Sequence, residues 1–284
     1  MSASIFDTDR DNHWCPGCGN FAILAAMKKA FEAQNLSPHD LLVVAGIGQA
    51  GKTPHYLACN MLHGLHGRAL PMATGVKTAN HKLNVVVSSG DGDCYGEGGN
   101  HFLAAIRRNL DITLLVHNNQ VYGLTKGQNS PTSALGMKTK LAASGPTSDP
   151  VNPIALALSA GAGFVARSFS GNPEQLTGLI QEAMAFRGFA MIDIFQPCVS
   201  FNKINTHFWY KERVRDINDS DHDASDLQKA LVLAMADPEQ DLPTGVFYKK
   251  ERPAFQDRFE VLNAGPLSAS PFDRAQMDDI LARA

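Results

Sequence analysis

The sequence predicts an α/β fold built on a parallel sheet that helices cover on both faces. Short apolar runs typical of buried strands alternate with segments whose apolar residues recur at helical spacing. Glycine-rich turns (GIGQAGK and GDGD) follow two of these runs. Because the strands of parallel sheets are buried on both sides, this alternation favours such a sheet. We expect strands at residues 41–45, 85–88, 112–117, 164–168 and 189–195, and helices at 21–34 (with Asn20 as N-cap), 53–62, 101–108 and 173–186.

Length and composition exclude several classes of protein. The chain has 284 residues, 44% of them hydrophobic, which is enough to bury a core. No apolar run approaches the roughly 18 residues of a membrane span, and the first 30 residues carry charges where a signal peptide needs its apolar segment. The formal net charge of -3, with no basic stretch, favours neither nucleic acid nor membrane as a partner. We therefore expect a cytoplasmic protein.

Charged residues are distributed unevenly along the chain. Of the 53 Asp, Glu, Lys and Arg residues, 25 lie in the last 74 positions. The charge-poor remainder predicts that another chain covers part of its surface. We expect one α/β domain over residues 1–200, and over 201–284 a C-terminal arm that packs on this domain or on a partner subunit. A long stretch rich in Gly, Ser and Pro lies between residues 122 and 153, and loops of that length are usually functional.

The most informative motifs lie where two predicted strands end. The sequence GDGD, with Asp91 and Asp93, follows one strand, and NNQVYG, with Asn119, follows the next. Open α/β sheets bind ligands at the carboxyl ends of their strands. A carboxylate, a carboxamide and a backbone carbonyl are the hard oxygen ligands that Mg²⁺ takes. Glycines let backbone N–H groups approach phosphates, and a helix predicted to start near Gly98 would offer its positive end.

GDG, followed about 27 residues later by NN, resembles the diphosphate-binding signature of thiamine diphosphate enzymes. The resemblance implies that Asp91, Asn119 and the Val121 carbonyl hold Mg²⁺. Members of this family also need a glutamate on a separate pyrimidine-binding domain, so we expect a partner subunit to supply that domain. The cofactor-binding residues implied are Ile47, Gly48, His66, Gly90, Asp91, Gly92, Asp93, Asn119, Val121, Gly123, Leu124 and Thr125.

The five cysteines (Cys15, Cys18, Cys59, Cys94 and Cys198) are not expected to form disulfides in a reducing compartment. The pair in CPGC fits half of a zinc site or half of an iron–sulfur site. A redox dithiol is disfavoured because no strand precedes it. Spacing alone leaves zinc and iron–sulfur about equal, since His13, His55, His63 and His66 are available to zinc.

A more specific resemblance covers roughly residues 12–215. WCPGCGN, LHGRALPMATGVKTAN, GDGD, NNQVYGLTKGQNSPTS and QPCVSFN together resemble the β subunit of 2-oxoacid:ferredoxin oxidoreductases. The resemblance implies thiamine diphosphate, Mg²⁺ and one [4Fe–4S] cluster, held by thiolates. It also implies an α subunit, in a heterodimer or a dimer of heterodimers. The reaction implied converts a 2-oxoacid and coenzyme A to acyl-CoA and CO₂, with single electrons passing to ferredoxin, or runs in reverse.

The sequence departs from this family at one cluster position. Where GIGCSG is common, the chain has Gln49 in GIGQAG. Cys15, Cys18 and Cys198 match the family pattern. We expect Cys59, on the next predicted helix, to be the fourth ligand. Cys94, a three-cysteine cluster and a non-cysteine ligand are the alternatives.

Two further residues are candidates for catalysis. Lys52 follows a glycine turn and is expected to hold the distal carboxylate of a dicarboxylic oxoacid, although a solvated lysine at a helix start explains it equally well. His66 is expected to hydrogen-bond an intermediate or a diphosphate oxygen, with a structural histidine as the alternative. TKGQNSPTS resembles members that use 2-oxoglutarate, which we expect to be the substrate. The other hypotheses are a pyruvate-type enzyme, a thiamine-dependent decarboxylase with a zinc site, and a cofactor-carrying scaffold.

Overall fold

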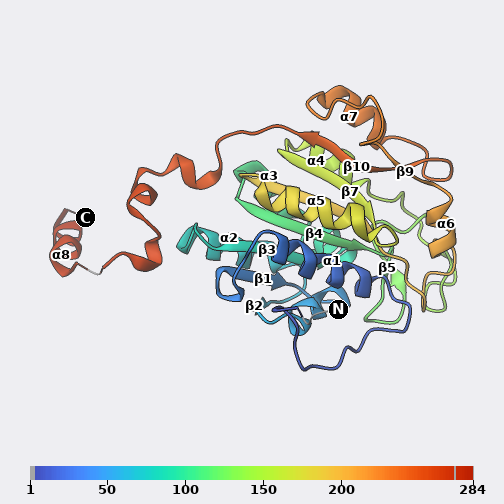
Figure 1. Ribbon diagram of the computed structural model, residues 1–284, viewed down its shortest axis with the longest axis horizontal. Helices are drawn as coiled ribbons and strands as arrows, with labels where there is room; N and C mark the ends of the chain where they lie inside the picture. Colours follow the sequence, from blue (N-terminus) through green and yellow to red (C-terminus); the bar gives the residue numbers. More distant parts are fainter. Residues whose placement is uncertain (1–3, 272, 284) are drawn as a thin grey trace.

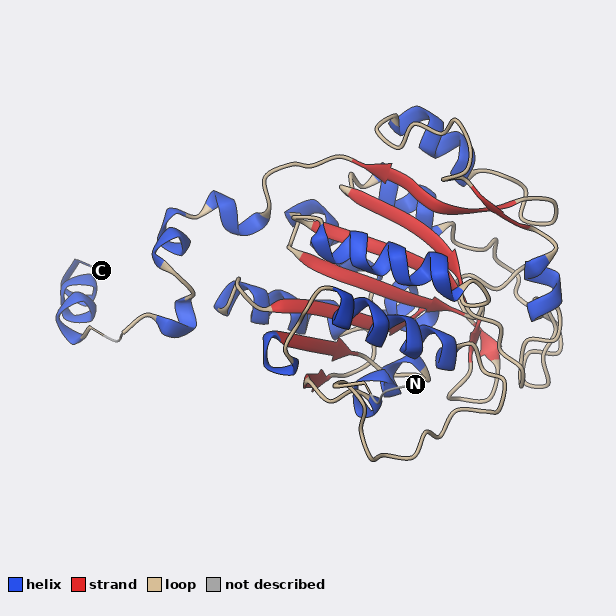
Figure 2. Ribbon diagram, viewed as in Figure 1, coloured by secondary structure: helices blue, strands red, loops and turns tan. Residues whose placement is uncertain are grey.

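A single sheet of eight strands forms the centre of the computed structural model, which describes residues 4–271 and 273–283. Neighbouring strands run parallel, except that β10 pairs antiparallel with β7 (Figure 2). The order across the sheet is β2 (Asn60–His63), β1 (Leu41–Ala45), β3 (Asn84–Gly90), β4 (Ile112–Asn118), β8 (Phe189–Phe195), β7 (Phe164–Phe169), β10 (Leu242–Lys249) and β9 (Val214–Asp216).

Helices cover both faces of this sheet (Figure 1). α1 (Asn20–Ala33) and α5 (Pro173–Ala185) pack on one face. On the other face lie α2 (Ala69–Ala79), α3 (Gly99–Arg108), α4 (Pro153–Ser159) and α7 (Leu227–Ala234). A short helix, α6 (His207–Lys211), follows β8. The predicted fold class is therefore confirmed.

The strand sequences explain why both faces need cover. In β1, Leu41 and Val43 join the core beneath α1 and α5, whereas Leu42 and Val44 join the core on the opposite face. Successive side chains of a strand point to opposite faces. An apolar run without alternation therefore buries both sides of the sheet.

The structure corrects two local predictions. Residues 53–62 are not a helix: a short 3₁₀ segment (Ala50–Tyr56) is followed by edge strand β2. Pro54 has no N–H to donate, which limits helical pairing there. Asn20 is not an N-cap either, because Gly19 holds that position and the Asn20 Oδ1 instead lies 2.8 Å from His117 Nδ1.

The sheet continues past residue 200, where we expected the domain to end. β9 and β10 both belong to it, so the extended segment begins only after Lys249. Composition misplaced this boundary because many of the residues after 200 are polar and exposed, although they include the buried strand β10 and the short edge strand β9. The segment then runs past α3 through three 3₁₀ turns (Phe255–Arg258, Glu260–Ala264 and Leu267–Ala269) to α8 (Arg274–Arg283), which stands clear of the body (Figure 1). No helix among the described residues is long and apolar enough to span a membrane.

Candidate active site

The GDGD motif lies where β3 ends and a helical segment begins. β3 ends at Gly90, Asp91 precedes a π-helical turn (Gly92–Glu97), and α3 continues from Gly99. The helix predicted to start near Gly98 is α3, which has Gly98 as its N-cap. The π-helical turn, which was not predicted, lies between Asp91 and this helix.

Asp91 is buried at the end of β3, with 1% of its surface exposed. Its Oδ2 accepts a 2.7 Å hydrogen bond from Thr132 Oγ1, and its Oδ1 accepts a 3.4 Å bond from the Asn119 backbone N–H. Burial raises the pKa of Asp91 to about 6, although these hydrogen bonds oppose the shift. A cation bound at this carboxylate would compensate for its desolvation.

Asn119 and Val121 approach Asp91 from the neighbouring strand. β4 pairs with β3 and ends at Asn118, so the turn that follows lies beside the end of β3. The Asn119 Oδ1 accepts a 3.0 Å bond from the Val121 N–H. A short hairpin follows, formed by β5 (Val121–Tyr122) and β6 (Gln128–Asn129). The three predicted Mg²⁺ ligands therefore lie at adjacent strand ends.

These motifs line one small cavity of about 60 Å³. All twelve residues predicted to bind the cofactor contribute to its wall. Four further residues line it that sequence reasoning missed, namely Gln49, Ala50, His117 and Tyr122. At Gly48 and Gly90 an added Cβ would meet no atom within 4 Å, so both positions leave space that a side chain would occupy. Two of the missed residues, Gln49 and Tyr122, are direct chain neighbours of predicted ones, which was the available signal.

The charge of this cavity favours a cation together with an anion. Asp91 and Asp93 are its carboxylates, and neither Lys nor Arg is among the described residues that line it. Burial lowers the pKa of His117 to about 3, so this ring is neutral. A diphosphate would therefore meet carboxylates unless a divalent cation lay between them. Hard oxygen donors from Asp91, Asn119 and Val121 fit Mg²⁺.

Asp93 holds three segments of the cavity wall together. Its Oδ1 accepts hydrogen bonds from the backbone N–H groups of Ile47 (3.1 Å) and Gly67 (2.7 Å). Its Oδ2 accepts a 2.5 Å bond from Ser89 Oγ. The Asp93 carboxylate is 3% exposed. It joins the loop that contains Ile47 and the loop that contains Gly67 to Ser89, near the end of β3. This role was not predicted, since the sequence indicated only a cofactor contact.

Replacing Asp93 with alanine is expected to lower the free energy of unfolding by about 3 kcal/mol or more, because it leaves buried donors without an acceptor. Asp93→Asn keeps one acceptor oxygen and should lose less. Urea unfolding of both variants measures the difference. Equal stability of Asp93→Ala and the wild type would contradict this role.

His66 lies at the edge of the cavity between two carboxylates. Its Nδ1 is 2.9 Å from Glu97 Oε2 and 3.7 Å from Asp93 Oδ1. Glu97 also accepts a hydrogen bond from Tyr122 Oη at 3.2 Å. The His66 ring therefore lies within ion-pair distance of Glu97, but its Nδ1 makes no hydrogen bond with any described residue. Lys52 does not line the cavity: it lies two residues beyond Ala50, which does.

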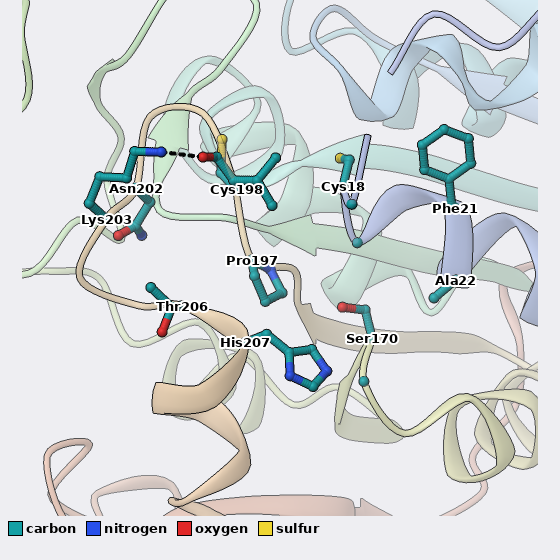
Figure 3. A pocket seen from close by; sticks show the side chains of 14 residues that line it. Cys18, Phe21, Ala22, Ser170, Pro197, Cys198, Asn202, Lys203, Thr206 and His207 are labelled. Carbon is teal, nitrogen blue, oxygen red and sulfur yellow. Dashed lines mark hydrogen bonds between the residues drawn. The ribbon is translucent and has the colours of Figure 1, made fainter. Parts of the chain in front are cut away.

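Three of the four cysteines predicted to hold a cluster lie near one another, although no three His, Cys, Asp or Glu side chains of the described residues are placed to hold a metal ion. Cys18 lies just before α1 and Cys198 in the loop after β8, and both line a cavity of about 600 Å³ (Figure 3). Burial raises the pKa of Cys18 to about 11, and the proximity of Cys198 and Cys15 contributes to this shift. Ser200 Oγ donates to Cys15 Sγ at 3.1 Å. The three thiols come from two segments, and thiolates are the residue type that ligates iron–sulfur clusters.

Cys59, the fourth predicted ligand, does not lie with the other three predicted cysteine ligands. It lies in the turn before β2 rather than on a helix. Burial raises its pKa to about 11, and the polar group that acts on its thiol is the Val43 backbone rather than another cysteine. Cys94 is buried inside the π-helical turn.

Gln49 stands at the position where the family has a cysteine. Trp14 Nε1 donates to the Gln49 carbonyl at 2.8 Å, so Gln49 adjoins the segment that carries Cys15.

Comparison with known proteins agrees with this fold and site. Residues 43–194 match the family model of the thiamine pyrophosphate enzyme C-terminal TPP binding domain, and residues 198–264 match the C-terminal model of the pyruvate ferredoxin oxidoreductase beta subunit. The fold and the site are therefore those of a thiamine pyrophosphate enzyme. The chain is 42% identical over 271 residues to subunit beta of 2-oxoacid:ferredoxin oxidoreductase 2 from Aeropyrum pernix, covering 92% of this chain and 88% of that one. It belongs to the family of 2-oxoacid:ferredoxin oxidoreductase beta subunits.

Two further relatives agree with this assignment. The 2-oxoglutarate synthase subunit KorB of Methanocaldococcus jannaschii is 35% identical over 256 residues, covering 89% of this chain and 94% of that one. The solved 2-oxoglutarate:ferredoxin oxidoreductase from Magnetococcus marinus, with 2-oxoglutarate, coenzyme A and succinyl-CoA bound, superimposes with a TM-score of 0.90 at 35% identity. That match covers 97% of this chain and 94% of the other. The resemblance predicted from the motifs is confirmed.

Proposed function

We propose that this chain is the cofactor-binding subunit of a 2-oxoglutarate:ferredoxin oxidoreductase of the cytoplasm. In the proposed reaction, 2-oxoglutarate, coenzyme A and two oxidised ferredoxins give succinyl-CoA, CO₂, two reduced ferredoxins and a proton, and the reverse direction fixes CO₂. The observation that carries the proposal is the cavity at the ends of β3 and β4, which all twelve predicted cofactor-binding residues line.

The residues of this cavity have distinct roles in the proposal. Asp91, Asn119 and the Val121 carbonyl hold Mg²⁺, which neutralises the diphosphate. Bound thiamine diphosphate supplies an electron sink for decarboxylation. His66, beside Glu97 at the cavity edge, hydrogen-bonds an intermediate or a diphosphate oxygen. Lys52 holds the distal carboxylate of the substrate, a role supported by its place two residues after the wall residue Ala50.

We further propose that Cys15, Cys18 and Cys198 hold an iron–sulfur cluster. Their proximity supports this assignment, and Gln49, which stands where the family has a cysteine, accepts a hydrogen bond at its backbone carbonyl from Trp14, the residue before Cys15. The position of Cys59 favours a cluster whose fourth ligand is not Cys59. The cluster would accept electrons one at a time and pass them to ferredoxin.

A partner α subunit is proposed to complete the site with a pyrimidine-binding domain. Edge strand β2 supports this, since Met61 and Leu62 are 43% and 40% exposed. Leu65, which follows the strand, is 76% exposed, and the nearby His66 lines the cavity. The extended C-terminal segment carries exposed apolar residues, including Ile280 and Leu281 on α8, and is proposed to pack on a partner chain. An unpaired edge with apolar side chains is typical of an interface.

The test is an assay of the anaerobically purified αβ complex. Rates with 2-oxoglutarate and with pyruvate are compared, with coenzyme A and a viologen dye as acceptor. We expect 2-oxoglutarate to give the higher kcat/KM, and Lys52→Met to lower kcat/KM for 2-oxoglutarate more than for pyruvate. A preference for pyruvate would overturn the substrate assignment, and a colourless protein without iron would overturn the cluster.

Binding of thiamine diphosphate with Mg²⁺ is expected to weaken below pH 6. The pKa of Asp91 is raised to about 6 by burial, so below that pH its carboxyl is protonated. Since the metal binds the ionised form, each further pH unit should lower the apparent affinity by up to about tenfold. Calorimetric titration between pH 5 and 8, corrected for titration of the free cofactor, measures this. An affinity that is constant across the range would contradict it.

A further inference from the structure

A cavity of about 660 Å³ lies between two loops and is strongly basic. One loop is the 126–141 segment and the other follows β8. Four lysines line the cavity, and the described residues that line it include no carboxylate. All four lysines are exposed. Among the described residues, none of these four lysines forms an ion pair, since the lysines that do are Lys28, Lys77, Lys229 and Lys249. The lining residues are Lys126, Lys138, Thr139, Lys140, Leu141, Ser200, Phe201 and Lys203.

Four ammonium groups around one cavity repel one another and create a positive potential there. The chain as a whole has a formal net charge of -3, so the cavity differs in sign from the average surface. Charge clusters of one sign steer partners of the opposite sign. The cavity is therefore suited to a negatively charged partner.

The lysine cavity adjoins the three clustered cysteines. Ser200, in its wall, donates to Cys15 Sγ at 3.1 Å. Lys203 Nζ donates to the Val199 carbonyl, directly after Cys198. Figure 3 shows Lys203 and Cys198 in the same loop. Cys15 is exposed. A partner seated on the lysines would therefore lie next to these thiols.

Apolar side chains border the lysine cavity. Leu141 is 54% exposed, Ile204 48% and Val199 39%. Charged groups that surround a modest apolar area are typical of transient contacts between proteins. The lysines project from exposed loop positions. This arrangement fits a broad protein surface better than a small, enclosed anion.

We infer that the lysine cavity and its apolar border dock an acidic electron-carrier protein. The inference rests on the proposed function, since it requires the cluster at Cys15, Cys18 and Cys198. The carrier's carboxylates would pair with the lysines. Its redox centre would then face the cluster over the short span between Ser200 and Cys15.

The test uses the double variant Lys138→Glu/Lys140→Glu in the αβ complex, with a purified ferredoxin of net negative charge as acceptor. At low salt we expect kcat/KM for ferredoxin to fall by at least about tenfold, since like charges would oppose docking. The wild-type rate should fall as salt rises, and the variant should lose most of this dependence. Viologen-linked activity and iron content should stay unchanged.

The control is Lys82→Glu/Lys250→Glu, which makes the same change of charge away from the cavity. Equal effects of both double variants on ferredoxin reduction would overturn the inference. So would an increase in KM for coenzyme A with unchanged ferredoxin kinetics, which would assign the lysines to its phosphates. Loss of α-subunit binding would also overturn it. Failure of the proposed function is separate, because the wild type would then lack iron or viologen activity.

Discussion

Replacing Asp91 with alanine is expected to abolish binding of thiamine diphosphate and Mg²⁺, and with it the activity. Asp91 is the carboxylate among the proposed Mg²⁺ ligands, and only 1% of its surface is exposed. Loss of a direct ligand should lower metal affinity by more than the roughly 100-fold that loss of a second-shell partner costs. Bound ligand stabilises the folded state by mass action. The measurement is therefore the rise in melting temperature on adding cofactor and Mg²⁺, which the variant should lack.

The matched control is Asp111→Ala. Asp111 directly precedes β4, at the end of the sheet opposite the cavity, where it pairs with Lys77. This variant should keep the cofactor-dependent rise in melting temperature. The absorption of the cluster should persist in both variants, since no cysteine is altered. A cofactor-dependent rise of wild-type size in Asp91→Ala would remove Asp91 from the metal site.

The fold was predictable where burial determines the sequence pattern. The core strands β1, β3, β4, β7 and β8 are largely apolar runs because the sheet is covered on both faces, and the sequence pattern reveals such runs directly. β2 gave no such signal, because its residues Asn60–His63 are exposed at the sheet edge. Its pairing with β1 depends on tertiary contacts rather than on its own pattern.

The candidate site was predictable for a related reason. Strands β3 and β4 are adjacent, so motifs at their ends had to meet. Contacts between distant segments could not be predicted in this way. The Asn20 side chain meets His117 from 97 positions away, and this partner replaces the expected helix cap. Cys59 was predicted to be the fourth cluster ligand because it was placed on a helix, whereas residues 57–59 form a bend that leads into β2.

Replacing Cys18 with serine is expected to remove the iron–sulfur cluster. Cys15 and Cys198 are both near enough to Cys18 to raise its pKa, so loss of Cys18 would leave two of the three thiols. Thiolate ligands hold such clusters, and serine is a poor substitute for them. Iron content and visible absorption of the anaerobic αβ complex should fall to near zero. Thiamine diphosphate binding should persist, because Cys18 does not line that cavity.

Cys59→Ala and Cys94→Ala provide the comparison. Both thiols are packed within the protein and separate from the other three, so we expect each variant to retain its iron and its absorption. Loss of iron from Cys59→Ala would restore Cys59 as the fourth ligand and would require the turn before β2 to move when the cluster binds. Full iron in Cys18→Ser would remove the cluster from this loop. Cys18 precedes α1 and Cys198 follows β8. Loss of the cluster should therefore also loosen the loop that follows Pro197, and faster proteolysis within that loop would reveal the change.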